Sequence, residues 1–172
     1  MAVLPIIIAP DPRLKNRAGA VVAVDPEVRQ LMDDMLETMY AAKGIGLAAP
    51  QVGVGKRVIV VDVMEPGETA APLLIANPEV VWESDELISV EEGCLSLPDQ
   101  YAEVMRPERI RVRYLDRDNQ VCERDADGLL ARCIQHEMDH LSGTLFVDHL
   151  SSLKRNIILR KLVKARKQPV PA

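Results

Sequence analysis

The segment QHEMDHL at residues 135–141 constrains this chain more than any other feature of its sequence. His136 and His140 are four positions apart, so an α-helix would place both imidazoles on one face, where they can bind a single metal ion. Apolar residues around the segment recur at the helical period, which predicts a helix over about Gly128–Ser142. Two histidines do not complete a metal site. The fold must therefore bring another element of the chain against this helix.

The third ligand can be sought by elimination. No glutamate follows Glu137, although glutamate is the third ligand in one large group of zinc proteases, and Phe146 stands where the metzincin proteases have their third histidine. His149 stays open as a ligand, but it follows the expected helix end and is more typical of a surface or packing histidine. Cys94, in EEGCLSLP, is the best-placed candidate, because a thiolate suits a divalent transition metal. The adjacent Gly93 lets the backbone pass close to another element.

The other two cysteines are interpreted differently. Cys133 lies three positions before His136 on the same helical face, but about 10 Å of helical rise separates it from His140. We therefore expect Cys133 to line the pocket beneath the site. Cys122 alternates with its neighbours in a predicted strand and is expected to be structural. An odd number of cysteines without an export signal argues against a disulfide framework and indicates a cytoplasmic protein with free thiols.

Two histidines and a cysteine would leave one coordination position for water or substrate, which is typical of a catalytic site. A metal ion lowers the pKa of a bound water from about 15.7 to roughly 7. Glu137, directly after the first histidine, is expected to act as a general base and not as a ligand. The alternative interpretation of Glu137 is a solvated helix carboxylate.

The remaining elements predict an α+β domain that occupies residues 1–172. We expect a helix over Pro26–Ala42, with Asp25 as its N-cap, and another over Leu153–Arg166. Strands are expected for the N-terminal apolar stretch MAVLPIII and at residues 57–63, 72–80, 86–98, 109–115 and, after a turn at 116–120, VCERD. Because helices and strands do not alternate as βαβ units, we expect antiparallel or mixed sheets with helices packed on them.

Charge is distributed unevenly along the chain. The formal net charge is −5, yet residues 151–172 contain seven Lys and Arg and no acid. The helix at about 151–167 is expected to pack apolar residues on the body, namely Leu153, Ile157, Ile158 and Leu162. The alternative is that its basic residues contact RNA phosphates. Residues 168–172 are expected to form a frayed tail.

No apolar run approaches the roughly 18 residues of a membrane span, so no membrane partner is expected.

The glycine-rich stretch KGIGLAAPQVGVGKR at 43–57 does not fit a phosphate loop, since GxGxxG would need glycine where Ala49 stands. A tight turn is expected there, and Gln51 offers an amide donor that could face a developing oxyanion. Taken together, GIGLAAPQ (44–51), EGCLS (92–96) and QHEMDHL (135–141) resemble the three signature motifs of the peptide deformylases. The resemblance extends over nearly the whole chain.

This resemblance implies one catalytic domain in which sheets surround a central helix that carries the HExxH motif. It implies Cys94, His136 and His140 as metal ligands and Glu137 as the catalytic acid/base. The side chain of Gln51 and the backbone N–H of Leu95 would stabilise the oxyanion, and Gly46 would contact the substrate main chain. The residues that the resemblance places around a methionine side chain are Ile45, Val90, Leu129 and Cys133.

The resemblance also implies a cofactor and a substrate. The family's divalent metal is typically Fe(II), with Zn(II), Ni(II) or Co(II) as substitutes, and its substrate is the N-formyl-methionine end of a newly made polypeptide, from which formate is released. Relatives with a basic C-terminal helix dock on the ribosome. Arg132 and Tyr101 depart from the family's pattern at the pocket rim, where an apolar residue and, in several bacterial relatives, an arginine are found.

Two other functions compete with this one. A small metallopeptidase would share the metal chemistry but would need a different third ligand and a long open cleft. A non-catalytic metal-binding relative would lack the acid/base or the oxyanion donor, whereas Glu137 and Gln51 are both present.

Overall fold

The structure is a computed structural model that describes residues 2–65 and 67–167. Its helices are α1 (Pro26–Ala41), α2 (Gly128–Leu141) and α3 (Ser152–Lys167), and its short 3-10 helices are η1 (Pro12–Lys15), η2 (Ala49–Val52) and η3 (Phe146–His149). Its strands are β1 (Gly46–Ala48), β2 (Val58–Val61), β3 (Leu73–Glu83), β4 (Leu87–Cys94), β5 (Leu97–Pro107), β6 (Arg109–Leu115) and β7 (Val121–Asp127). Over these described ranges, no helix has both the length and the apolar character that a membrane crossing requires. The architecture is α+β, as the sequence predicted.

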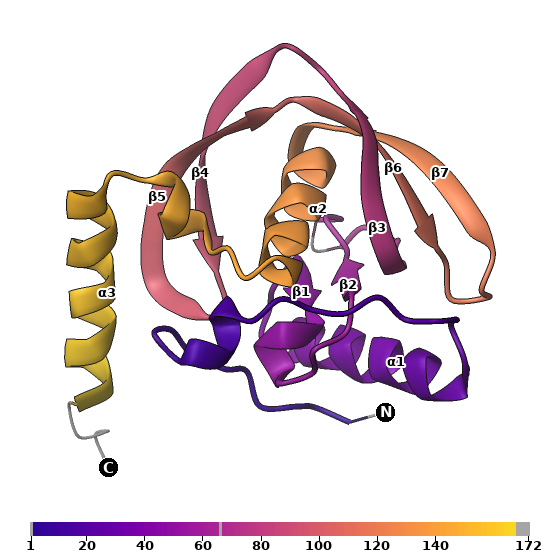
Figure 1. Ribbon diagram of the computed structural model, residues 1–172, viewed down its shortest axis with the longest axis horizontal. Coiled ribbons are helices and arrows are strands. Elements are labelled where there is room, and N and C mark those ends of the chain that lie inside the picture. The colour runs from indigo at the N-terminus through magenta and orange to yellow at the C-terminus, as the bar shows by residue number, and fades with distance from the viewer. Residues whose placement is uncertain (1, 66, 168–172) are drawn as a thin grey trace.

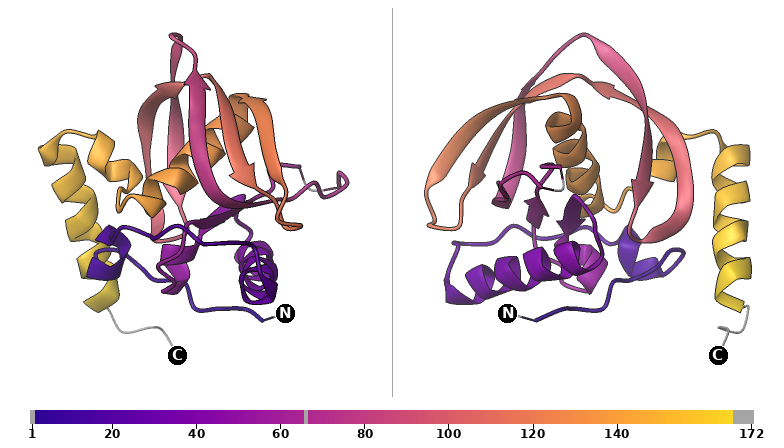
Figure 2. Two further views of the ribbon diagram at one scale, coloured as in Figure 1. Left: turned by 45° about the vertical axis from the view of Figure 1, so that its right-hand side comes forward. Right: turned by 180° about the vertical axis from the view of Figure 1, so that it is seen from behind.

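The strands form two antiparallel sheets. Five strands pair in the order β1-β2-β3-β6-β7, and β4 pairs with β5 in a separate two-stranded hairpin. Helix α2 lies in the centre of the molecule, with the hairpin on one side and the larger sheet on the other (Figures 1 and 2). The helix with the HExxH motif is therefore enclosed by both sheets, which keeps its functional face away from bulk water.

Strand β2 is covered on both of its faces. Ile59 and Val61 belong to the apolar cluster that packs against α2, while Val58 and Val60 belong to the cluster that packs against α1. All four residues are fully buried, which explains why the segment VIVV is uniformly apolar and does not alternate with polar residues. The adjacent edge strand β1 is thereby fixed between α1 and α2.

Helix α1 begins and packs as its sequence predicted. Asp25 is the N-cap, and its carboxylate accepts a hydrogen bond from the backbone N–H of Val28 at 2.9 Å. Pro26 occupies the first turn, where its missing N–H costs nothing. The methionines of the apolar stripe, Met32, Met35 and Met39, are fully buried, so they are core residues.

Three of the expected local structures were wrong. The predicted strand at 86–98 is two strands, β4 and β5, because the chain reverses at Leu95–Ser96. Residues 2–8 form no strand; Ile7 is buried and donates its N–H to the carbonyl of Gln51 at 2.7 Å without joining a ladder. GIGLAAPQ is not a tight turn but the short strand β1 followed by η2.

Helix α3 lies at the side of the molecule, next to β5 (Figure 1). Only part of its predicted apolar face is buried: Ile158 and Leu162 pack into the cluster around Phe146, whereas Leu153 is 70% exposed and Ile157 is 41% exposed. The helix therefore contacts the body through a narrow apolar strip. The tail that we expected at 168–172 lies outside the described residues.

Candidate active site

The structure brings Cys94, His136 and His140 together. Their ligand atoms all lie within 4.8 Å of one another, and Cys94 Sγ is 3.4 Å from His140 Nε2. Cys94 is the last residue of β4, where the hairpin turns, and both histidines are on the buried face of α2. His149 is not part of this cluster, since its Nε2 lies 2.8 Å from the Asp139 carboxylate.

Glu92 orients the first histidine. One of its carboxylate oxygens is 2.8 Å from His136 Nδ1, and Arg106 donates two further hydrogen bonds to the carboxylate, at 2.6 and 2.8 Å. Burial, the largest single effect, opposes ionisation of Glu92, but the hydrogen bonds from Arg106 and His136 outweigh it and lower the pKa of Glu92 to about 2. An ionised Glu92 accepts a hydrogen bond from His136 Nδ1, which leaves Nε2 as the ring atom that can face a metal ion.

Burial affects the two histidines differently. It lowers the pKa of His140 well below the usual range, so this imidazole is neutral. For His136, burial also opposes the charge, but the Glu137 carboxylate, Cys94 and Glu92 outweigh burial together and raise its pKa. Two buried polar atoms here, Glu137 Oε1 and His140 Nδ1, have no hydrogen-bond partner in the described chain. One cysteine and two histidines next to unpartnered polar atoms fit a divalent transition metal ion.

Glu137 is buried beside these ligands. Its Oε1 is 3.9 Å from His140 Nε2, and burial raises the pKa of Glu137 to about 7. A carboxylate with a pKa near neutrality can both accept and return a proton at physiological pH. The close approach of β1 holds it in place: a Cβ on Gly46 would lie 2.5 Å from Glu137 Oε2 and 2.7 Å from Cys133 Sγ. Any side chain at position 46 would therefore displace Glu137 or Cys133.

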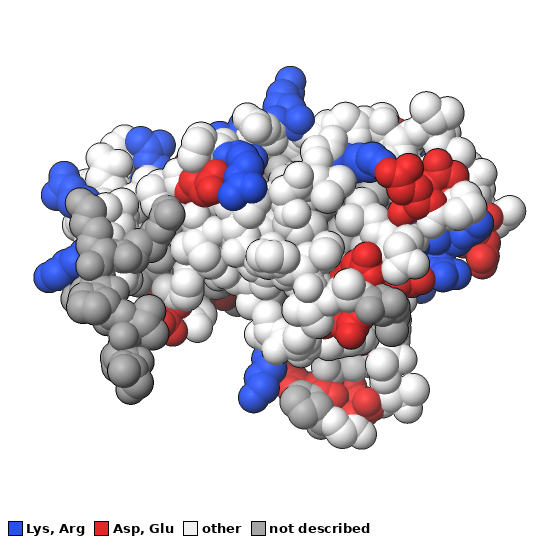
Figure 3. Space-filling model, turned by 90° about the horizontal axis from the view of Figure 1, so that it is seen from below, with Lys and Arg blue, Asp and Glu red and all other residues white. Residues whose placement is uncertain are grey.

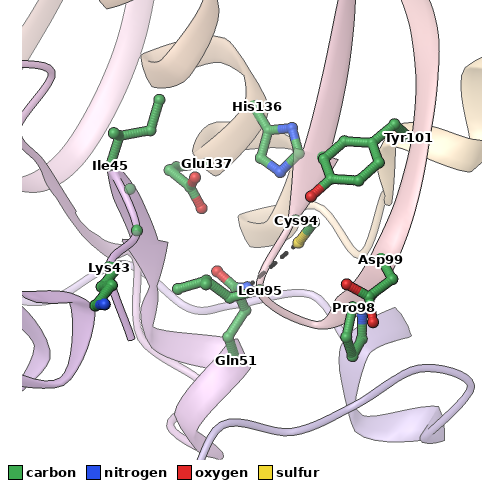
Figure 4. A pocket seen from close by; sticks show the side chains of 13 residues that line it. Lys43, Ile45, Gln51, Cys94, Leu95, Pro98, Asp99, Tyr101, His136 and Glu137 are labelled. Carbon is green, nitrogen blue, oxygen red and sulfur yellow. Dashed lines mark hydrogen bonds between the residues drawn. The ribbon is translucent and has the colours of Figure 1, made fainter. Parts of the chain in front are cut away.

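The side chain of Gln51 presents an N–H donor close to Cys94. Its Oε1 accepts the N–H of Ala48 at 2.9 Å, which orients the amide so that Nε2 faces the site. From there Nε2 lies 3.0 Å from Ser96 Oγ. It also lies 3.5 Å from Cys94 Sγ (Figure 4). The hairpin turn places the backbone of Leu95 directly after Cys94. A side-chain amide and this turn thus flank the three candidate metal ligands.

These residues open into a cavity of about 420 Å³. Lys43 and Ile45 lie on one side of it, and Pro98, Asp99 and Tyr101 lie on the other (Figure 4). Other residues that line it are Gly44, Gly46, Gln51, Gly93, Cys94, Leu95, His136 and Glu137. A cavity of this size admits a side chain and the adjoining main chain of a peptide.

Some predicted pocket residues lie apart from this cavity. Val90 and Leu129 are 39% and 49% exposed and are not among its lining residues, so their contact with substrate stays a prediction. Cys133 is buried, and its thiol donates to the carbonyl of Ile45 at 3.4 Å. Burial raises the pKa of Cys133 well above the usual value, so its thiol stays protonated.

The two unusual rim residues differ from each other in position. Tyr101 is 62% exposed and covers Gly93 so closely that a Cβ there would lie 2.5 Å from the Tyr101 ring. Arg132 is not at the cavity surface but buried, at 6% exposure, with its guanidinium on Glu92. Sequence reasoning missed Glu92, Arg106 and Arg132 as a group, although Glu92 lies within the EGCLS motif.

A structural zinc site is closed by four protein ligands, whereas this cluster offers three candidate ligands, two of which line a cavity, and a buried carboxylate beside them. The fold and the site together define a metal-dependent hydrolase. A family model described as polypeptide deformylase matches residues 3–156, and the chain belongs to this family. The protein accordingly removes the formyl group from the N-terminal formyl-methionine of newly synthesised polypeptides and releases formate.

Relatives and solved structures agree with this family. The peptide deformylase of Methylocella silvestris is 59% identical over 170 residues, covering 97% of this chain and 87% of the relative. That of Phenylobacterium zucineum is 55% identical over 167 residues, covering 97% and 99%. The crystal structure of the Ehrlichia chaffeensis peptide deformylase in complex with actinonin superposes with a TM-score of 0.93 at 45% identity, covering 98% of this chain and 100% of that one.

Proposed function

We propose that the whole chain is one catalytic domain in which Cys94, His136 and His140 hold the metal ion and Glu137 is the acid/base. The mutual distances of the three ligand atoms, all within 4.8 Å, are the observation that carries this assignment. When bound, the ion acts as a Lewis acid that lowers the pKa of a coordinated water and polarises the formyl carbonyl. One cysteine and two histidines are a ligand set that suits such an ion.

The residues around the ligands perform the proton transfers and bind the developing charge. Glu137 takes a proton from the attacking water as the new C–O bond forms at the formyl carbon. The amide of Gln51 and the backbone N–H of Leu95 donate to the formyl oxygen as it becomes anionic. Glu137 then returns the proton to the amine nitrogen as the C–N bond breaks, which releases formate and a free N-terminus.

The substrate is proposed to enter through the 420 Å³ cavity. Gly46, with no side chain between its backbone and Glu137, lets the substrate main chain approach the site. Ile45 and Cys133 are proposed to contact the methionine side chain, together with Val90 and Leu129 at its outer end.

The experiment that tests these roles is Glu137→Ala, assayed for formate release from formyl-Met-Ala-Ser. Loss of a general acid/base is expected to lower kcat by about 10²- to 10⁴-fold. Glu123→Ala, which removes a carboxylate from the exposed edge of β7, serves as the control and should retain activity. Elemental analysis must show equal metal content in both. Near-normal kcat in Glu137→Ala would contradict the mechanism, and internal cleavage of unformylated peptides would favour a metallopeptidase.

We propose Fe(II) as the ion bound in the cell, with Zn(II), Ni(II) or Co(II) as substitutes. A cysteine and two histidines accept all four, so cellular supply and geometry decide between them. Purification without oxygen followed by elemental analysis is expected to recover about one iron per chain, and exposure to air should then lower activity. Recovery of zinc alone, with activity that air does not affect, would contradict this assignment.

A cytoplasmic location and a ribosomal contact are also proposed. Helix α3 has no acidic residue, and its described basic residues are Lys154, Arg155, Arg160, Lys161 and Lys164. Basic side chains stand out at the edge of the molecule that α3 forms (Figure 3). Such a surface fits the phosphates of ribosomal RNA near the site where nascent chains emerge.

Truncation after Ser151 tests the ribosomal contact. Co-sedimentation with ribosomes at low and moderate salt is expected to weaken in the truncated chain and, for the full chain, to fall as salt increases. Because truncation also exposes the apolar strip around Phe146, a variant with Lys154, Lys161 and Lys164 changed to Gln keeps the helix and removes only charge. Unchanged binding in that variant would exclude the RNA contact.

A further inference from the structure

Arg132 is a buried arginine of α2 that no step of the reaction uses. It lies one helical turn before His136, and its side chain is 7% exposed. Its guanidinium donates to three acceptors: the Glu92 carboxylate, the carbonyl of Val104 at 2.8 Å and the carbonyl of Ile88 at 2.6 Å. An arginine costs free energy when it is buried unless its donors are paired, and here three of its five N–H groups donate to protein acceptors.

These acceptors connect Arg132 to both strands of the hairpin. Ile88 and Glu92 belong to β4, and Val104 belongs to β5. Cys94 ends β4, two residues beyond Glu92. The planar fork of the guanidinium can hold a carboxylate and two carbonyls at fixed angles, which a lysine could not. Arg132 therefore joins the helix that bears two of the metal ligands to the hairpin that bears the third.

Arg132 also completes the set of donors around Glu92. One carboxylate oxygen accepts from Arg106 Nη2 and faces His136 Nδ1, while the other accepts from Arg106 Nε and Arg132 Nη1. A carboxylate offers about four lone-pair positions, and all four are used by these contacts. Turning the Glu92 carboxylate would therefore break hydrogen bonds. Arg106 in turn donates to Asp139 of α2 at 2.8 Å. Two buried arginines thus stand against two carboxylates, a balanced cluster that spans α2 and the hairpin.

We propose that Arg132 is a positioning residue of the metal site: it fixes Glu92 against His136 and fastens the β4–β5 hairpin, and with it Cys94, to helix α2. The inference rests on the proposed ligand set of Cys94, His136 and His140. Loss of a group that orients a metal ligand typically lowers metal affinity by about 10- to 100-fold. We therefore expect Arg132→Met to bind Co(II) or Zn(II) at least 10-fold more weakly.

The test measures metal affinity and ligand geometry without relying on activity. The metal-free protein is titrated with Co(II) against a competing chelator, and the visible d–d bands and the thiolate-to-cobalt charge-transfer band are recorded. In Arg132→Met both sets of bands should shift or weaken, because Cys94 and His136 are no longer held together. Arg132→Lys keeps the charge but reaches fewer acceptors, so it should recover part of the affinity.

Two controls separate positioning from general stability. Met32→Ala removes a fully buried side chain from α1 and should lower Tm without changing Co(II) affinity. Arg111→Met removes an exposed arginine that pairs with Asp125, and it should change neither quantity. If Arg132→Met does not fold, Arg132→Gln is used in its place, and the same loss of Co(II) affinity is expected. The inference would be overturned if the variant that folds binds Co(II) with the affinity and absorption bands of the parent.

One more variant shows whether a negative result concerns the role of Arg132 or the proposed ligand set. His140→Ala should abolish tight Co(II) binding if the ligand set is right. Binding at parental affinity in His140→Ala would overturn the ligand set itself. Weak binding in His140→Ala combined with parental binding in Arg132→Met would overturn only the role of Arg132.

Discussion

Gly46→Ala is expected to disable the site through a single methyl group. The added Cβ would lie 2.5 Å from Glu137 Oε2 and 2.7 Å from Cys133 Sγ, whereas ordinary contacts begin at 3.4 Å. The carboxylate is therefore about 0.9 Å too close to the added Cβ and would have to shift by about that much from its place beside His140. A misplacement of about 1 Å near the reacting atoms can lower the rate about 10²-fold. This corresponds to about 2.7 kcal/mol in the activation free energy.

The assay is steady-state formate release from formyl-Met-Ala-Ser, normalised to metal content. The matched control is Gly55→Ala, because nothing lies within 4 Å of a Cβ at that glycine and its activity should stay near that of the parent. Gly46 has no left-handed φ, so the effect of its substitution is purely steric. If Gly46→Ala retained kcat/KM within about threefold of the parent with full metal content, the argument that β1 positions Glu137 would fail.

Three further predictions concern other parts of the molecule. Gln51→Leu removes the amide donor and should lower kcat by about 10²- to 10³-fold with metal retained; a threefold effect in formate release would contradict its role. Met35→Ala, in the core beneath α1, should reduce the free energy of unfolding by about 3 kcal/mol in urea titrations and leave kcat unchanged; a loss under 1 kcal/mol would be unexpected. Partial burial, with the hydrogen bond to Asp62, raises the pKa of Tyr40 to about 12. The folded protein thus keeps a proton that the unfolded chain loses near pH 10, and this stability disappears between pH 10 and 12. Urea midpoints of the parent should therefore fall more than those of Tyr40→Phe between pH 9 and 11.5, and equal falls would contradict the shift.

Local signals in the sequence predicted the helices and the β6–β7 hairpin well. Asp25 and Pro26 define the start of α1 by the chemistry of a helix N-terminus, which involves only neighbouring residues. The alternation in RIRVRYL matches the buried and exposed faces of β6. The helix with His136 and His140 followed from periodicity alone. Where the determinants are within a few residues of one another, the sequence was sufficient.

The errors have a common physical origin in long-range contacts. The turn at Leu95–Ser96 contains no glycine, proline or asparagine, and the strand partner of β4 that defines it begins only at Leu97. The contacts of Arg132 reach 28 to 44 positions along the chain, so no local pattern could indicate them. Cys94 was identified as a candidate ligand by elimination, but only the hairpin geometry explains how it reaches α2.

The separation of the ligands along the chain affects when a metal ion can be acquired. Cys94 and His140 are 46 positions apart, and closing a flexible loop of that length costs about 3 kcal/mol in chain entropy, before a constant term. An ion that bound the chain during translation would have to offset this entropy cost. In the folded protein the hairpin and the central helix already hold the two residues together. With the proposed ligand set, we therefore expect metal loading to follow folding and the ion to exchange without the polypeptide coming apart. The metal bound at any moment would then reflect which metals the cell supplies and not which was present when the chain was made.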